Sequence, residues 1–270
     1  LEIIGKYGAD ALRFALATGN SPGNDMRFSD EKIGAARNFA NKIWNASRFV
    51  RMNLDIEEIA LPSADRLRTE DKWILSLFNR LAGEVRENID SYELGIALSK
   101  LYDFIWDIFC DWYIELLKPR LSAKGTEDNP VAQNVIAWVL SNTMKLLHPF
   151  LPFITEEIWL ALPHTGDSIM ISSYPQTDPA LDFPEDEASM DRIIELIKAV
   201  RNRRAEMNVP PSKKTTLYIV SAYGDTFNSG VSHFFTRLAS ASEVIYTGEF
   251  TGDNAVSIVT GSATAYLSLI

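Results

Sequence analysis

The stretch HPFLPFITEEIW, residues 148–159, separates one predicted helix from the next. Pro149 and Pro152 cannot donate backbone hydrogen bonds, so a helix that reaches His148 has to end there. Thr155 and the two glutamates after it place a hydroxyl and two carboxylates where a new helix would present free N–H groups and the positive end of its dipole. We therefore expect a fixed corner between two helices.

A long helix with a narrow inner face is predicted well before this corner. Ser29 is a suitable N-cap, and Asp30 and Glu31 suit the first turn. Small and branched residues recur at helical spacing and are expected to face the core: Ile33, Ala36, Ala40, Ile43, Ser47 and Val50.

Further helices complete the first part of the chain. They are predicted at 69–90, from near Ser91 toward Pro119, from an Asn129-Pro130 cap to the corner, and from the corner to Pro163. Short connections favour antiparallel neighbours. Residues 30–163 are therefore expected to form an antiparallel helical bundle, preceded by a separate segment at 1–29.

The pattern changes after the bundle, which makes the predicted fold mainly α with a small α+β domain at its end. Residues 164–184 contain three prolines and are interpreted as a linker with a β-like run at Ile169–Ser172. Residues 185–270 are interpreted as the α+β domain. Its predicted elements are helices at about 186–207 and between Ser229 and Ala241, and strands at Thr215–Val220, Val244–Thr247, Val256–Val259 and Ala265–Ile270.

Composition and charge exclude several classes of protein. The 270 residues are 46% hydrophobic, which suits packed cores, and no apolar run has the length of a membrane span. No secretory signal is recognisable, and a single cysteine, Cys110, fits a reducing cytoplasm. The net charge of −10, from 26 basic and 36 acidic side chains, argues against bulk attraction to nucleic acid. Any RNA contact therefore has to be local.

No catalytic or metal site is predicted. The three histidines are isolated and the cysteine has no partner, so metal-ligand spacing is missing. Four carboxylates at i, i+4 spacing, Asp103, Asp107, Asp111 and Glu115, are interpreted as a solvated helix face, with an acid/base pair as the alternative.

The long helix that starts after Ser29 is the strongest candidate for a binding function. Winding it at 3.6 residues per turn gives two adjoining stripes away from the core face: Asn38, Lys42, Asn45 and Phe49 on one, and Arg37, Asn41, Trp44, Arg48 and Arg51 on the other. Amides can pair with base edges, cations with phosphates, and an exposed phenyl ring can stack on an unpaired base. The alternative is that Phe49 and Trp44 complete a wide apolar face and the charges are solvated surface.

Several motifs carry a resemblance to a known family. They are the corner, KYGADALRF at 6–14, RNFANKIWNASRFV at 37–50, CDWYIE at 110–115 and RNRRAEMNVPPS at 201–212. Together and in this order they resemble valyl-tRNA synthetases, which are class I aminoacyl-tRNA synthetases. The corner is shared with the isoleucine and leucine enzymes, whereas residues 37–50 favour valine. The resemblance covers essentially the whole chain.

The resemblance implies that this chain is a C-terminal piece that binds the anticodon stem and loop of the tRNA for valine. Residues 1–29 would be a remnant of the stem-contact region and residues 30–163 the anticodon-binding domain. Matching positions make Lys42 and Phe49 the expected contacts of the middle and third anticodon bases. The further expected RNA-binding residues are Asn45, Arg48, Asn38 and Arg37.

The resemblance also implies a division of labour within the parent enzyme. That enzyme would join valine to tRNA with ATP and magnesium. This chain lacks both adenylate-forming motifs of the family and its editing domain. It should therefore be inactive alone and need no cofactor. We expect a cytoplasmic monomer with no DNA or membrane partner. The alternative function is a helical protein-interaction module that uses the Trp44/Phe49 surface without binding RNA.

Overall fold

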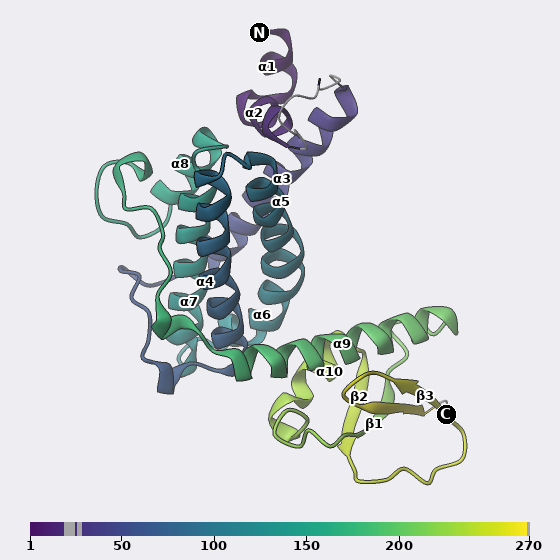
Figure 1. The fold of residues 1–270 in the computed structure, drawn as a ribbon. Helices are drawn as coiled ribbons and strands as arrows, with labels where there is room; N and C mark the ends of the chain where they lie inside the picture. Colours follow the sequence, from purple (N-terminus) through teal and green to yellow (C-terminus); the bar gives the residue numbers. More distant parts are fainter. Residues whose placement is uncertain (19–24, 26–28, 269–270) are drawn as a thin grey trace. The chain divides into compact units, whose positions relative to one another are not determined.

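The computed structural model describes residues 1–18, 25 and 29–268, which form two compact units, Leu1–Pro184 and Glu185–Ile270. The first unit is helical and the second combines helices with a four-stranded sheet (Figure 1). The predicted fold class is therefore confirmed. The finer predicted boundaries, 1–29, 30–163 and 164–184, all fall inside the first unit and stay predictions.

The first unit is built from helices and contains no strand among its described residues. Its helices are α1 Glu2–Tyr7, α2 Ala9–Ala17, α3 Asp30–Asn53, α4 Thr69–Asp90, α5 Leu94–Asp103, the π-helix η2 Phe104–Tyr113, α6 Ile114–Ser122, α7 Asp128–Leu147 and α8 Pro152–Leu160. Three short 3-10 turns lie in the connections, η1 Ala64–Arg66, η3 Ile169–Ile171 and η4 Pro179–Leu181. The hydroxyl of Ser29 accepts a hydrogen bond from the N–H of Lys32, as the predicted cap of α3 requires.

Ion pairs at the helix ends show that the bundle runs up and down. Lys124, just after α6, lies 2.9 Å from Asp55, just after α3. Arg68, just before α4, lies 3.0 Å from Asp128 at the start of α7. Each of these pairs joins like ends, so α3 runs in the direction of α6, and α4 in the direction of α7. Arg120 in the last turn of α6 pairs with Asp71 in the first turn of α4, so α6 and α4 are antiparallel.

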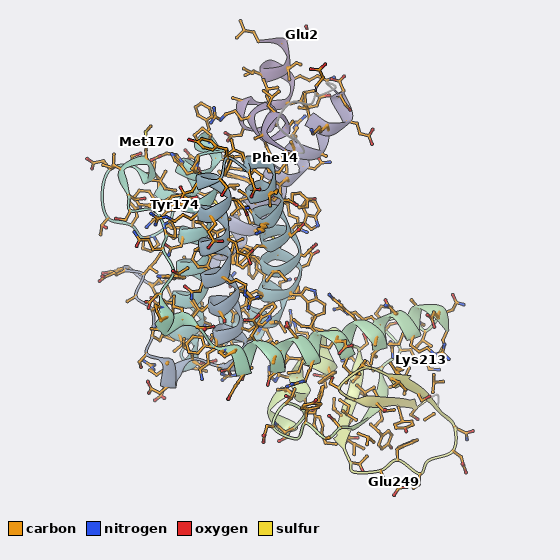
Figure 2. The ribbon with its side chains drawn as sticks, in the orientation of Figure 1. Glu2, Phe14, Met170, Tyr174, Lys213 and Glu249 are labelled. Atoms are coloured by element: carbon orange, nitrogen blue, oxygen red, sulfur yellow. The ribbon has the colours of Figure 1, made fainter. Side chains whose placement is uncertain are left out.

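The inner face of α3 is close to the predicted one but contains a large ring. Five of the six predicted core residues are buried, whereas Ala40 is half-buried. Phe39 is fully buried as well, between Phe14 of α2 at 4.9 Å and Tyr102 of α5 at 4.8 Å between ring centroids. Phe14, labelled in Figure 2, thus connects the N-terminal helices to the bundle.

A buried charge cluster joins α4, α6 and α7. The guanidinium of Arg120 donates two hydrogen bonds of 2.8 Å to Asp71 and bonds of 2.7 and 2.9 Å to Asp128. It also donates to Glu70 at 3.0 Å, and the hydroxyl of Tyr113 donates to Asp71. The side chain of Arg120 is only 6% exposed, so these carboxylates are its charge partners in place of water.

The corner exists, but its helix starts earlier than predicted. α8 begins at Pro152, because a proline in the first turn has the right φ and needs no N–H partner. Thr155 is therefore inside the helix, where its hydroxyl donates to the carbonyl of Leu151 at 2.7 Å. The cap comes from Asp10 of α2, whose carboxylate accepts from the N–H groups of Phe153 and Ile154 at 3.3 and 2.7 Å. The predicted capping role of Thr155 was wrong.

Three other predictions differ from the structure. The run Ile169–Ser172 is not a strand, since Ile169–Ile171 forms the 3-10 turn η3. Asn129 is not the cap of α7, which begins at Asp128; its amide donates instead to the carbonyls of Arg120 and Leu121. Pro119 does not end the third helical segment, which continues to Ser122. A proline in the last turn removes only one intrahelical hydrogen bond.

The second unit consists of one long helix, one short helix and a mixed sheet. Its elements are α9 Pro184–Glu206, β1 Thr215–Val220, the 3-10 turn η5 Ser229–Val231, α10 Ser232–Leu238, β2 Ala241–Tyr246, β3 Ala255–Val259 and β4 Thr264–Ser268. The strand order is β2-β1-β4-β3, with β1 parallel to β2 and antiparallel to β4. Leu217 and Ile219 alternate with half-buried residues, which is the pattern of a sheet with one covered face. The last two residues of the predicted fourth strand, 269–270, lie outside the described residues.

Replacing Arg120 with methionine should destabilise the protein by about 3–5 kcal/mol, because Glu70 and Asp71 would stay buried without their cation. Methionine keeps most of the side-chain length, so the loss of stability would come from the missing charge and not from a cavity. Urea unfolding would measure it. The matched control is Arg86→Met, since Arg86 is 56% exposed and 4.0 Å from Asp90. That change should stay within about 0.5 kcal/mol, and an equal loss in both variants would contradict a special role for the cluster.

Replacing Glu70 with glutamine should change the pH dependence of stability. Burial, and then the neighbouring charge of Asp71, raise the pKa of Glu70 from 4.5 to about 7. A carboxyl that holds its proton more tightly in the folded state stabilises the fold at low pH and loses that contribution as the pH rises from about 4.5 to 7. Glutamine cannot ionise, so the variant should gain stability relative to the original chain across this window.

Unfolding midpoints of both proteins at several pH values would test this. The exposed Glu87 of the same helix is the matched control, because Glu87→Gln makes the same substitution at a position that is not buried. A pH-independent difference for Glu70→Gln would contradict the raised pKa.

Candidate nucleic-acid interface

The structure brings the six predicted contact residues to one side of α3. At 3.6 residues per turn they occupy an arc of about 140° that faces away from the core. Four of them are exposed and two are half-buried. The exposed residues are Arg37, Asn38, Asn45 and Arg48, and the half-buried ones are Lys42 and Phe49.

Lys42 is held by two residues of η2. Its ammonium lies 2.7 Å from the Oδ1 atom of Asp111 and 3.8 Å from the ring centroid of Trp106. The side chain of Lys42 is 22% exposed, whereas that of Asp111 is 53% exposed. Trp106 stacks in turn on Tyr102, with ring centroids 5.5 Å apart and an angle of 13° between the rings. Lys42 is therefore a fixed donor inside an ion pair, not a mobile bare cation.

The π-helix explains why sequence spacing missed both partners of Lys42. In an α-helix, residues five apart such as Trp106 and Asp111 point in directions about 140° apart. In a π-helix the hydrogen bonds run from i to i+5, so residues five apart lie roughly one turn above each other. The switch from α5 to η2 thus aims the indole and the carboxylate at the same side chain of α3.

Phe49 offers part of a ring to solvent. Its side chain is half-buried, and the ammonium of Lys118 lies 5.6 Å from its ring centroid. Lys118 forms an ion pair with Glu115 on the same helix. The ring is thus held beside α6 while it keeps some surface for stacking.

Two further apolar side chains lie on this face. Trp44, which the helical stripes included, is 41% exposed, and Met52, which was missed, is 79% exposed. Met52 lies four residues after Arg48 and three after Phe49, so helical spacing alone could have identified it. A narrow groove beside Trp44 is lined by Arg48 and Arg51 of α3 and by Glu157 of α8.

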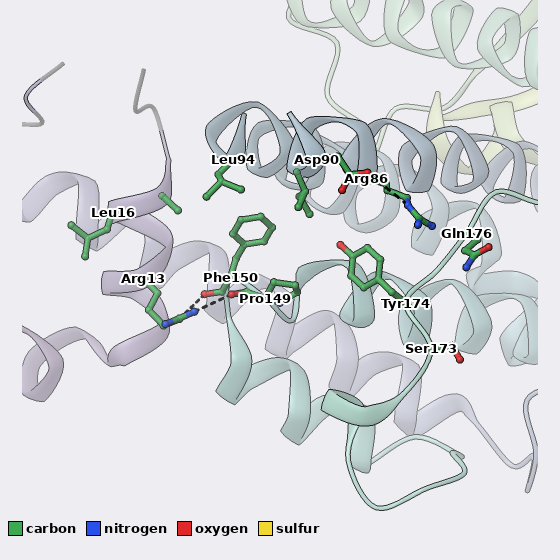
Figure 3. A pocket seen from close by; sticks show the side chains of 12 residues that line it. Arg13, Leu16, Arg86, Asp90, Leu94, Pro149, Phe150, Ser173, Tyr174 and Gln176 are labelled. Carbon is green, nitrogen blue, oxygen red and sulfur yellow. Dashed lines mark hydrogen bonds and ion pairs between the residues drawn. The ribbon is translucent and has the colours of Figure 1, made fainter. Parts of the chain in front are cut away.

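A larger pocket lies elsewhere in the first unit. It is an open hollow of about 930 Å³ beside α2, the corner and the end of α4, and Figure 3 shows its lining residues. At its edge Arg13 donates to the carbonyls of Pro149 and Phe150 at 2.9 and 3.1 Å. None of the six predicted contact residues lines it.

The arginines of the motif at 201–212 have structural roles within the second unit. Arg204 is buried and donates to Thr215 and to the carbonyls of Pro210 and Lys213. Arg203 pairs with Glu206 at 2.9 Å. Arg204 therefore holds the connection between α9 and β1, whereas the Arg203–Glu206 pair lies within α9.

The described residues show neither a metal site nor a reactive thiol. They contain no group of three or more histidine, cysteine, aspartate or glutamate side chains that could hold a metal ion. Burial raises the pKa of Cys110 to about 12, which keeps the thiol protonated. Among the same residues, no helix has the length and apolar character needed to cross a membrane.

Comparison with known proteins gives matches over most of the chain. The family model of the anticodon-binding domain of tRNA ligase matches residues 71–219. A valine–tRNA ligase of Clostridium tetani is 49% identical over 273 residues, which is 100% of this chain and 31% of the relative. A valine–tRNA ligase of Clostridium acetobutylicum is 48% identical with the same coverage. This chain therefore spans about a third of the length of these relatives.

Solved structures support the fold. The LeuRS chain of a ternary LeuRS–tRNA–LeuAMS complex from Agrobacterium radiobacter K84 superposes with a TM-score of 0.54 at 19% identity. The match covers 67% of this chain and 21% of that one. At this identity the likeness concerns the fold alone.

Proposed function

Because the chain belongs to the family of anticodon-binding domains of tRNA ligases, we propose that the outer face of α3 binds the anticodon loop of a tRNA. The resemblance to valyl-tRNA synthetases seen in the motifs is confirmed by relatives that are about half identical over the whole chain. The partner of the face is therefore the tRNA for valine.

The observation that carries this proposal is the mixture of groups on one exposed helix face. Arg37 and Arg48 can meet phosphates, Asn38 and Asn45 can pair with base edges, and Phe49 presents part of a ring for stacking. Single-stranded RNA loops are recognised by this combination of charge, amides and aromatic rings. Because the chain as a whole carries a charge of −10, binding has to depend on this local face.

The whole protein is proposed to be a valine–tRNA ligase. In it, ATP and magnesium would supply the energy for joining valine to tRNA at catalytic parts outside this chain. The chain itself contributes recognition and not chemistry. We further propose that it acts as a monomer in the cytoplasm, with no DNA partner.

Titration with RNA stem-loops tests the proposed function directly. The chain should bind a stem-loop that carries a valine anticodon more tightly than one with a changed middle base, since each well-paired base edge contributes about 1–3 kcal/mol of discrimination. Fluorescence anisotropy at low salt would measure both affinities. Equal affinities, or no binding, would favour the protein-interaction alternative for the Trp44/Phe49 surface.

Phe49→Ala should weaken binding of the valine stem-loop by about 1–3 kcal/mol through lost stacking. The control is Phe153→Ala, which removes an aromatic ring that is 66% exposed on α8. That variant should bind like the original chain. An unchanged affinity of Phe49→Ala would remove Phe49 from the interface.

A further inference from the structure

The acidic side chain of Asp111 in η2 reaches the outer face of α3 and pairs there with Lys42. We propose that Asp111 is a specificity-determining residue, which keeps Lys42 away from RNA phosphates and forms with it a donor–acceptor pair for the edge of an anticodon base. This inference rests on the proposed function. It assigns a role to a residue that spacing alone placed on a solvated helix face.

The ion pair changes what Lys42 can bind. A phosphate oxygen that approached its ammonium would also approach the carboxylate of Asp111, 2.7 Å away and 53% exposed. Like charges at such distances repel. Moreover, a lysine that is already neutralised releases no further counterion when RNA binds. Lys42 is therefore a poor phosphate contact.

The same pair is well suited to a base edge. An ammonium has three donors and a carboxylate about four acceptor sites, so the bond between them leaves donors and acceptors side by side. Base edges present donors and acceptors side by side as well, and aspartate and lysine are both known partners for them. The indole of Trp106, 3.8 Å from the ammonium, makes it a positioning residue that fixes where the donors lie.

The contribution of Asp111 to stability is small, because its side chain is 53% exposed. Exposed ion pairs add little stability, and a carboxylate on this face weakens general attraction to RNA. Arg37 and Arg48 of the same face have no ion pair among the described residues. The face of α3 thus has two kinds of cation. The exposed arginines would contact the RNA backbone, and Lys42, which is paired with Asp111, would contact a base.

The test compares Asp111→Asn with Asp107→Asn, which removes the same charge from an exposed position one turn earlier in η2. Affinities would be measured for stem-loops that differ only in the middle or the third anticodon base. The original chain and Asp107→Asn should prefer the valine anticodon equally. In Asp111→Asn that preference should fall at least about 5-fold, while affinity for mismatched stem-loops stays the same or rises.

Salt dependence gives a second readout. Lys42→Met should leave the slope of log affinity against log salt unchanged, whereas Arg48→Met should reduce it by about 0.7, the value for one phosphate of a single strand. In Asp111→Asn the unmasked lysine should increase the slope by a similar amount. Circular dichroism would confirm that every variant is folded.

The two proposals fail in different ways. If the original chain shows no base preference, the proposed function falls and this inference falls with it. If the original chain has a preference that Asp111→Asn keeps, or if Lys42→Met lowers the salt slope as Arg48→Met does, the inference alone is overturned.

Discussion

The buried guanidinium of Arg120 is the constraint on which the bundle depends. It holds carboxylates from the starts of α4 and α7 against the end of α6. A charge cluster of this kind is directional, so it fixes which helix ends meet as well as holding them together. The backbone carbonyl of Arg120 also accepts from Asn129, whose side chain bonds Gln133, and Gln133 in turn accepts from the N–H of Asp55. The end of α3 is thereby tied to the same cluster.

This attachment matters for the proposed RNA interface because α3 is held along its length. Its C-terminal end is joined to the charge cluster through Asp55, its middle is fixed by Phe39 between two rings, and its outer side is tied to η2 through Lys42. Side chains on a helix fixed in this way need little ordering when a partner binds, and that lowers the entropic cost of recognition. Rigid placement therefore favours reading of a base over loose electrostatic attraction.

The features that could be predicted from the sequence depend mostly on residues that are close together in the chain. Hydrophobic spacing identified α3 and α4, and β-branched and aromatic content identified β1. The hydroxyl of Ser29 was recognised as a cap because its partner lies three residues away. The cap of α8 could not be recognised, since Asp10 is more than 140 residues from the N–H groups that it accepts from. Contacts between distant segments leave no periodic signal in the sequence. The prediction of Thr155, the nearest suitable residue, as the cap of α8 was therefore wrong.

The candidate site shows a different limit of sequence reasoning. The exposed residues of α3 follow from its regular 3.6-residue period, so Arg37, Asn38, Asn45 and Arg48 were placed correctly on its outer side. The partners of Lys42 were missed because η2 does not have that period. Asp111 had been grouped with Asp103 and Asp107 as one acidic stripe, as an α-helix would align them. The π-helical turn removes this equivalence and gives Asp111 a partner on another helix. A local change of helical period can thus give one member of a solvated stripe a partner on the proposed binding face, and π-helical turns occur frequently at functional sites.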